Sequence, residues 1–275
     1  PWSAAAAETR ARAEKACALA KAAIQLVHRP PPAGGRQVAW CICRNVITHA
    51  LDYDSRVLTS SLVLPHAEVV EHHAWDVVQA VLGYAPNQQQ KDQIQLPTHL
   101  GGCQMPMPTL TAPLARASDL IETGHLLRKA VVQWGFDLET AKTVDGVDAE
   151  IADGLFEKLV ERRLKFGAPG QAQPCIAKEA ADRTDAGLLR PSAPERHTLS
   201  AMFRASAEAR YQILFETGDD RDRTRLLSAG GPNAGKSLVA PAGLQATHYN
   251  DEQFTEVLRW RLGTRATANT AICMN

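Results

Sequence analysis

The sequence has few aromatic residues, no net formal charge and no long apolar run. Aromatic side chains make up 5% of its 275 residues, whereas 45% are hydrophobic and alanine is abundant. Without a run of about 18 apolar residues, the sequence predicts no membrane span. Low aromatic content with much alanine favours helices. We therefore expect a mainly α fold: an irregular multi-helix bundle with long Gly/Pro loops and little or no sheet.

The cysteine content and the first residues point to a reducing compartment. Six cysteines are scattered over the whole length, unlike the dense disulfide frameworks of small secreted proteins. The first residues lack a basic region followed by an apolar one, so we expect no secretory signal peptide. Because the sequence starts with Pro1 rather than Met, we interpret it as a fragment of a longer intracellular protein, cytoplasmic or nuclear.

The charges are unevenly distributed along the chain. Residues 1–50 contain seven Lys/Arg and two acidic residues, whereas residues 51–150 contain thirteen acidic residues and six basic ones. A dedicated nucleic-acid-binding protein is usually basic overall. Any such role must therefore be local, or shared with other parts of a longer protein.

Apolar residues recur at helical spacing in seven segments, and each is predicted to be a helix. The segments cover roughly residues 4–28, 36–51, 65–83, 111–127, 147–166, 195–217 and 250–263. Two mostly polar segments, residues 84–95 and 218–247, are expected to be loops. The stretch 167–175 has the composition of a linker, so we predict two regions, residues 1–166 and 167–275.

Capping residues and prolines predict the helix boundaries. Ser3 is expected to cap the first helix. Pro65 is expected to open the third, after an apolar segment at 57–64 that is compatible with either strand or helix. The last helix is the best specified, because Asn250 and Gln253 have the spacing of a reciprocal capping box.

One segment matches the phosphate-loop pattern G-x-x-x-x-G-K-[ST]. It begins at Gly230 and includes Gly235, Lys236 and Ser237. In that motif backbone amides surround the phosphates, the lysine neutralises charge and the hydroxyl binds Mg²⁺, provided that a buried strand precedes the loop and a helix follows. The preceding residues are highly charged and Pro241 follows closely. A Gly-rich surface turn is therefore the preferred interpretation, and nucleotide binding is the alternative.

Two further groups are candidates for metal binding. Asp219 and Asp220 are adjacent carboxylates of the kind that hold metals in polymerases, but they follow a helix in a charged segment, which favours a solvated helix end. His66 and His73 have a spacing that allows one helix face, but no further ligand accompanies them at suitable spacing. Exposed helical histidines are the preferred interpretation.

The end of the last helix carries a basic and aromatic group. Arg259, Arg261 and Arg265 lie around Trp260. Arginine side chains suit phosphates, and aromatic rings stack on bases. These four residues are the candidate nucleic-acid contacts. A solvated helix face with a partly packed tryptophan is the preferred interpretation, and nucleic-acid contact is the alternative.

Three stretches together are similar to one family. The first is residues 36–83, with the sequences VAWC (38–41) and AWD (74–76). The second is residues 96–105 (LPTHLGGCQM), and the third joins 229–235 (AGGPNAG) to the helix that ends in RLG at 261–263. In this order and spacing they resemble the region downstream of the polymerase palm in reverse transcriptases of non-LTR (LINE-type) retrotransposons.

The resemblance implies a helical, thumb-like region in 1–166 and a second helical or linker region in 167–275. Together these would hold template and primer, so RNA and DNA are the expected partners. The family's Tyr-x-Asp-Asp palm motif is absent, which implies that this piece has no catalytic residues and does not polymerise DNA alone. Gln104 also departs from the small residue that is usual in the family's turn.

The resemblance also bears on metal ions and nucleotides. It implies that the glycines from Gly230 to Gly235 form a turn without a nucleotide role. Cys273 lies where the first ligand of the family's zinc knuckle is expected, and the other ligands are not in this sequence. We expect no cofactor in this chain, although Mg²⁺ and Zn²⁺ are expected in a full-length parent.

Overall fold

The computed structural model describes residues 2–29, 35–116, 118–119, 198–232, 234–235, 238 and 249–264. Helices make up 78% of these residues, and none of the described residues lies in a strand. The predicted mainly α fold is therefore confirmed. Within the described ranges, no helix combines the length and the apolarity that crossing a membrane requires.

The chain divides into two compact units, and each combines segments that are distant in the sequence. Unit 1 consists of Pro1–Ala50, Glu68–Pro108 and Leu214–Asn275, and unit 2 of Leu51–Ala67 and Thr109–Ile213. Unit 1 thus draws on both regions predicted from the sequence. The boundary predicted between residues 166 and 167 lies outside the described residues, as do the helix expected at 147–166 and the linker expected at 167–175.

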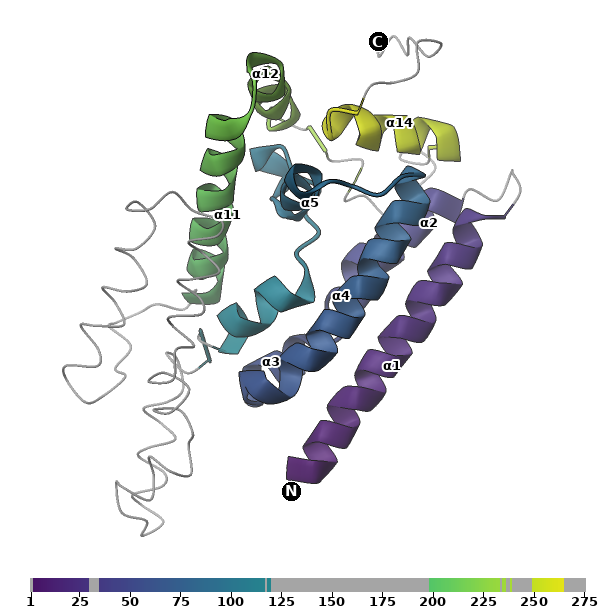
Figure 1. Cartoon of the computed structure of the whole chain (residues 1–275), viewed down its shortest axis with the longest axis vertical. Coiled ribbons are helices and arrows are strands. Elements are labelled where there is room, and N and C mark those ends of the chain that lie inside the picture. The colour runs from purple at the N-terminus through teal and green to yellow at the C-terminus, as the bar shows by residue number, and fades with distance from the viewer. Residues whose placement is uncertain are drawn as a thin grey trace, which may run out of the picture. The chain divides into compact units, whose positions relative to one another are not determined.

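The helices of unit 1 come from all three of its segments (Figure 1). They are α1 (Trp2–Val27), α2 (Gly35–Ile42), the π-helix η1 (Cys43–Ile47), most of α4 (Ser60–Leu82), α5 (Gln88–Gln95), the 3₁₀ helix η2 (Thr98–Leu100), α12 (Asp220–Ala229) and α14 (Asp251–Arg261). Unit 2 contains α3 (Asp52–Val57), most of α11 (Thr198–Thr217) and a helical segment at 109–116. In unit 2, Arg116 donates from Nη1 to the carbonyl of Arg56 at 2.9 Å.

Small side chains shape the α1 side of unit 1. The buried face of α1 consists of one threonine, four alanines and one valine at helical spacing: Thr9, Ala13, Ala16, Ala20, Ala23 and Val27. Alanine adds little bulk, so α1 packs closely on α2 and η1. The helical spacing of apolar residues predicted within 65–83 is confirmed in α4, since Val70, Ala74, Val77 and Val81 are all fully buried.

Helix α14 is fixed to α2 by a ring contact and a cap. Trp40 and Phe254 meet edge to face, with ring centroids 6.2 Å apart, and both are fully buried. The Asp251 carboxylate accepts hydrogen bonds from the backbone N–H groups of Gly35 (3.2 Å) and Arg36 (2.9 Å). The first N–H groups of a helix have no partner inside it, so Asp251 satisfies the start of α2 from a different helix.

Two predicted helix starts are wrong. Helix α1 begins at Trp2, so Ser3 already lies inside it; the alanines that follow favour a longer helix. Helix α4 begins at Ser60, which places Pro65 inside the helix and makes most of segment 57–64 helical. The start is set by Thr59, whose carbonyl accepts the first hydrogen bonds of the helix, from Leu62 at 3.0 Å among others.

Each of the two segments that were predicted to be loops contains a helix. Each of these helices begins directly after a capping residue. Helix α5 lies within 84–95, where Asn87 and Gln90 form a reciprocal capping box with bonds of 2.9 and 3.0 Å. Helix α12 lies within 218–247, where Asp219 is the cap. The expectation that these segments are loops was therefore wrong. Their polar composition does not show the apolar spacing from which a helix is predicted. These helices are stabilised mainly by their caps and by the contacts described below.

Candidate nucleic-acid interface

Two of the three stretches that carry the family resemblance meet at the end of α14. Arg261 donates from Nε to the carbonyl of Gly102 and from Nη2 to the carbonyl of Thr98, both at 2.8 Å. Gly235 lies against the same guanidinium, and a Cβ added to it would be 3.0 Å from Nη2. The 96–105 stretch and the 229–235 stretch therefore pack on a single arginine of the RLG stretch.

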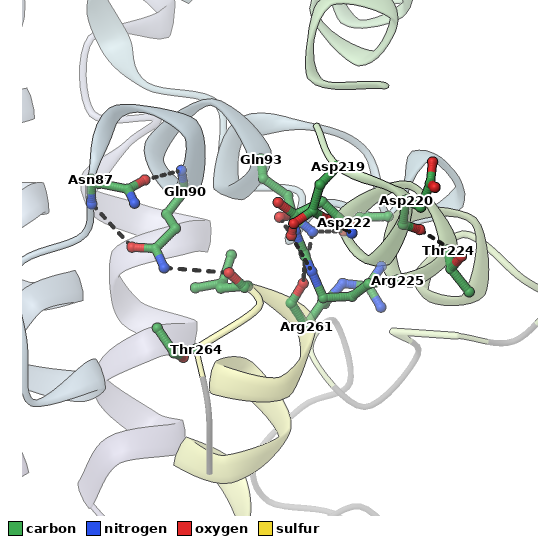
Figure 2. Close-up of polar contacts among 12 residues, drawn as sticks. Asn87, Gln90, Gln93, Asp219, Asp220, Asp222, Thr224, Arg225, Arg261 and Thr264 are labelled. Atoms are coloured by element: carbon green, nitrogen blue, oxygen red, sulfur yellow. Dashed lines mark hydrogen bonds and ion pairs between the residues drawn. The ribbon is translucent and has the colours of Figure 1, made fainter. Parts of the chain in front are cut away.

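Gln93 of α5 is the second centre of this network (Figure 2). It is 2% exposed. Its Nε2 donates to the carbonyls of Gly101 (2.9 Å) and Arg261 (2.8 Å), and its Oε1 accepts from Nη1 of Arg225 (2.8 Å). Arg225 also donates to the Arg261 carbonyl and forms an ion pair with Asp222 at 3.0 Å. One amide thus connects α5, the Gly-Gly turn, α12 and α14.

The position of Arg261 corrects its predicted role. A phosphate contact needs an exposed guanidinium, but Arg261 is 3% exposed and bonded to main-chain carbonyls. Burial lowers its pKa from the ordinary value for arginine. A buried charge is costly unless it is hydrogen-bonded, and the carbonyls of Gly102 and Thr98 provide this compensation. Arg261 therefore holds the fold together rather than facing a ligand.

Arg259 also has partners within the protein. It donates to the carbonyl of Leu82, at the end of α4, from Nη2 (2.9 Å) and from Nε (3.3 Å). Its Nη1 forms an ion pair with Glu256 at 3.0 Å. Trp260 is 50% exposed, whereas Arg265 lies outside the described residues. The two predicted arginines that the structure describes, Arg259 and Arg261, therefore bond within the protein instead of forming a basic surface around Trp260.

The phosphate-loop pattern stands in a different context from the one that the motif requires. Gly230 directly follows α12, and its N–H bonds back to the carbonyl of Leu226 at 3.0 Å, so a helix precedes the pattern in place of a strand. A Cβ on Gly230 would be 2.8 Å from the carbonyl oxygen of His99. Gly235 has a φ of +80°. Lys236 and Ser237 lie outside the described residues. Gly230 and Gly235 thus allow close packing inside the protein.

The other candidate metal ligands have local roles. Asp219 caps α12 through a hydrogen bond of 2.7 Å, and the Asp220 side chain is fully exposed. On α4, His73 Nδ1 lies 3.3 Å from a carboxylate oxygen of Asp76. In the part of the chain that the structure describes, no group of three or more His, Cys, Asp or Glu residues is arranged to hold a metal ion. Cys273 lies outside that part.

The two residues that organise the site, Gln93 and Arg225, were not predicted from the sequence. Both lie in segments expected to be loops. The signals were present: Asn87 and Gln90 have capping-box spacing, and Asp219 precedes a segment that continues for one helix length. A long-range contact such as the bond from Gln93 to the Arg261 carbonyl leaves no pattern in a single sequence.

No protein-family model matches this chain, and neither a curated protein nor a solved structure gives a match. What supports a function is therefore the sequence pattern and the geometry of unit 1.

Proposed function

We propose that this chain is the non-catalytic, post-palm region of a reverse transcriptase-like protein of the non-LTR type. It would provide a helical scaffold beside an RNA-directed DNA polymerase palm and contact the template and primer there. The Gly-Gly turn, the 229–235 turn and the end of α14 would be structural parts of this scaffold.

One observation carries the proposal: the second and third stretches of the resemblance pack on each other. Turn 96–105, turn 229–235 and the RLG segment meet at the guanidinium of Arg261. Their convergence is what a scaffold module with these turns requires.

Nucleic-acid contacts of unit 1 would use side chains that face solvent. Trp260 offers a half-exposed ring on α14, and aromatic rings stack on unpaired bases. Lys15, Lys21 and Arg29 on or after α1, and Arg221 on α12, are exposed cations that suit phosphates. Arg259 and Arg261 would contribute indirectly by fixing the helix that carries Trp260.

Two other functions are weighed against this one. A phosphate-loop protein would bind nucleotide through Gly230, Gly235, Lys236 and Ser237. Such a loop follows a buried strand, whereas a helix, α12, precedes Gly230. A helical protein-interaction module would use the same scaffold without nucleic acid. Binding assays separate all three.

The test is fluorescence anisotropy with the purified chain and a labelled RNA–DNA hybrid that has a single-stranded template overhang. ATP and GTP with Mg²⁺ serve as competitors. The proposal predicts hybrid binding that the nucleotides do not displace. Tight Mg²⁺-dependent nucleotide binding without hybrid binding would contradict it in favour of the phosphate loop. Binding to neither would favour the interaction module.

A further inference from the structure

The N-terminal half of α1 neutralises its own charges. Arg10 pairs with Glu14 at 2.8 Å, and Arg12 pairs with Glu8, in each case one helical turn away. Ion pairs of opposite sign at this spacing are neighbours on the helix surface, so they leave this half without net charge. Any attraction of α1 for an anionic ligand therefore comes from the other half of the helix.

The C-terminal half of α1 carries positive charge that no acid balances. Lys15 and Lys21 on the helix, and Arg29 two residues after its end, are all exposed. Within the described part of the chain, none of these three side chains forms an ion pair. The sequence contains no Asp or Glu from residue 15 to residue 51. This stretch includes α2 and η1, which pack on α1 (Figure 1). Because α2 and η1 add no acid to this surface, they do not cancel the positive field of the three cations.

The surface between these cations is low and lacks apolar anchors. Ala18, Ala22 and Gln25 are exposed, and their spacing places them on one face of the helix. The large hydrophobic side chains that are exposed among the described residues include none from α1. A helix that binds a membrane surface inserts Trp, Phe or Leu, and a protein interface depends on large anchors in its centre. Cations around small side chains instead suit a polyanionic backbone.

We infer that the face of α1 formed by Lys15, Lys21 and Arg29, here called the basic face, binds the phosphate backbone of a nucleic-acid duplex. Contacts to phosphates position a protein but carry no sequence information, so the basic face binds duplexes of any sequence. From Lys15 to the end of α1 at Val27 it is about 18 Å long, which is the axial length of about five base pairs. The inference rests on the proposed function, which supplies the template–primer duplex as ligand, and it names the surface that holds this duplex.

The test is fluorescence anisotropy of the full chain with a blunt RNA–DNA hybrid of about 12 base pairs, more than twice the length of the basic face. A blunt hybrid has no overhang on which Trp260 could stack, so its binding reports the backbone contacts. Lys15→Gln combined with Lys21→Gln should reduce the slope of log affinity against log salt by about 2, since each phosphate contact contributes about 0.9. Adding Arg29→Gln should reduce the slope by about 1 more, and the losses should not depend on the sequence of the hybrid.

Arg10→Gln combined with Arg12→Gln is the matched control. It removes two cations from the same helix, but from the half in which they pair with glutamates, so it should leave the slope unchanged. Lys15→Arg combined with Lys21→Arg keeps both charges and should retain the wild-type slope. Glutamine and arginine are both good helix formers, so every variant should keep the circular dichroism spectrum of the wild-type chain.

Three results would overturn the inference while hybrid binding by the wild-type chain persists. One is a wild-type slope in the Lys15 and Lys21 double variant, and another is an equal loss of slope in the Arg10 and Arg12 double variant. The third is tighter binding to vesicles that contain phosphatidylserine than to the hybrid, which would assign the basic face to a membrane surface. These results leave the proposed function standing. Absence of hybrid binding by the wild-type chain would contradict both the inference and the proposed function.

Discussion

The side-chain amide of Gln93 donates a hydrogen bond of 2.8 Å to the main-chain carbonyl of Arg261, a residue 168 positions later. The same amide group serves Gly101, and its oxygen serves Arg225. A buried amide with all of these bonds fixes the mutual positions of α5, α12 and α14, and removing it leaves buried partners unsatisfied. The stability of unit 1 should therefore depend on Gln93 more than on any exposed residue of α5.

Gln93→Leu keeps the approximate size of the side chain and removes its hydrogen bonds. We expect the free energy of unfolding to fall by about 2–4 kcal/mol, because buried carbonyls and a guanidinium lose a partner. Urea denaturation followed by circular dichroism measures this. Gln89→Leu, at an exposed position of the same helix, should change stability by less than about 0.5 kcal/mol. Similar losses in both variants would show that the network contributes no special stability.

Gly235 is predicted to be needed for its backbone conformation and its contact with Arg261. With a φ of +80° and a guanidinium 3.0 Å from the position of a Cβ, Gly235→Ala should destabilise the chain by about 1–2 kcal/mol. Gly231 lies in the same turn without a positive φ, so Gly231→Ala is the control and should cost less. Thermal melting compares the two, and equal melting temperatures would contradict the assignment of Gly235 to packing.

Asp251 is predicted to stabilise α2 as well as α14. Asp251→Ala removes the acceptor of the Gly35 and Arg36 N–H groups, and losing a helix cap costs about 0.5–2 kcal/mol. Glu252→Ala, at the exposed neighbouring position, removes the same charge without the cap. Hydrogen exchange of the first amides of α2 should accelerate in Asp251→Ala alone. Equal protection in both variants would argue against the cap.

Two buried thiols should make the chain sensitive to alkali. Burial raises the pKa of Cys43 and of Cys103 to about 12, from an ordinary value of 9.0; for Cys103 the nearby Arg261 opposes part of this rise. A raised pKa in the folded state means that stability is fully present below pH 9.0 and is lost as the pH rises towards about 12. The unfolding free energy should fall across that range.

Urea denaturation at several pH values tests this dependence. Cys103→Ala should make the unfolding free energy fall less steeply with pH above pH 9.0, since it removes one of the two buried thiols that cause the fall. Below that pH the wild-type and variant curves should run parallel. Identical slopes at high pH would show that Cys103 does not titrate differently in the folded state.

Local signals in the sequence predicted much of the fold but little of the site. Helical spacing predicted the buried stripe of α4, and the capping box of Asn250 and Gln253 predicted the start of α14, which the structure forms. Polar composition misled the analysis at α5 and α12, because such helices bury few side chains and depend on caps. The burial of Arg261 could not be predicted, since it depends on a turn more than 150 residues earlier.

The measurement that tests the central claim most directly is the salt dependence of hybrid binding by the wild-type chain and by Trp260→Ala. The account predicts that the logarithm of affinity falls linearly with the logarithm of salt concentration. The slope of this line reports the number of phosphate contacts. Trp260→Ala should weaken binding by about 1–3 kcal/mol through lost stacking on the overhang and leave the slope unchanged, because no charge is removed. Absence of binding at low salt, or binding that ignores both salt and Trp260, would contradict a template- and primer-contacting role.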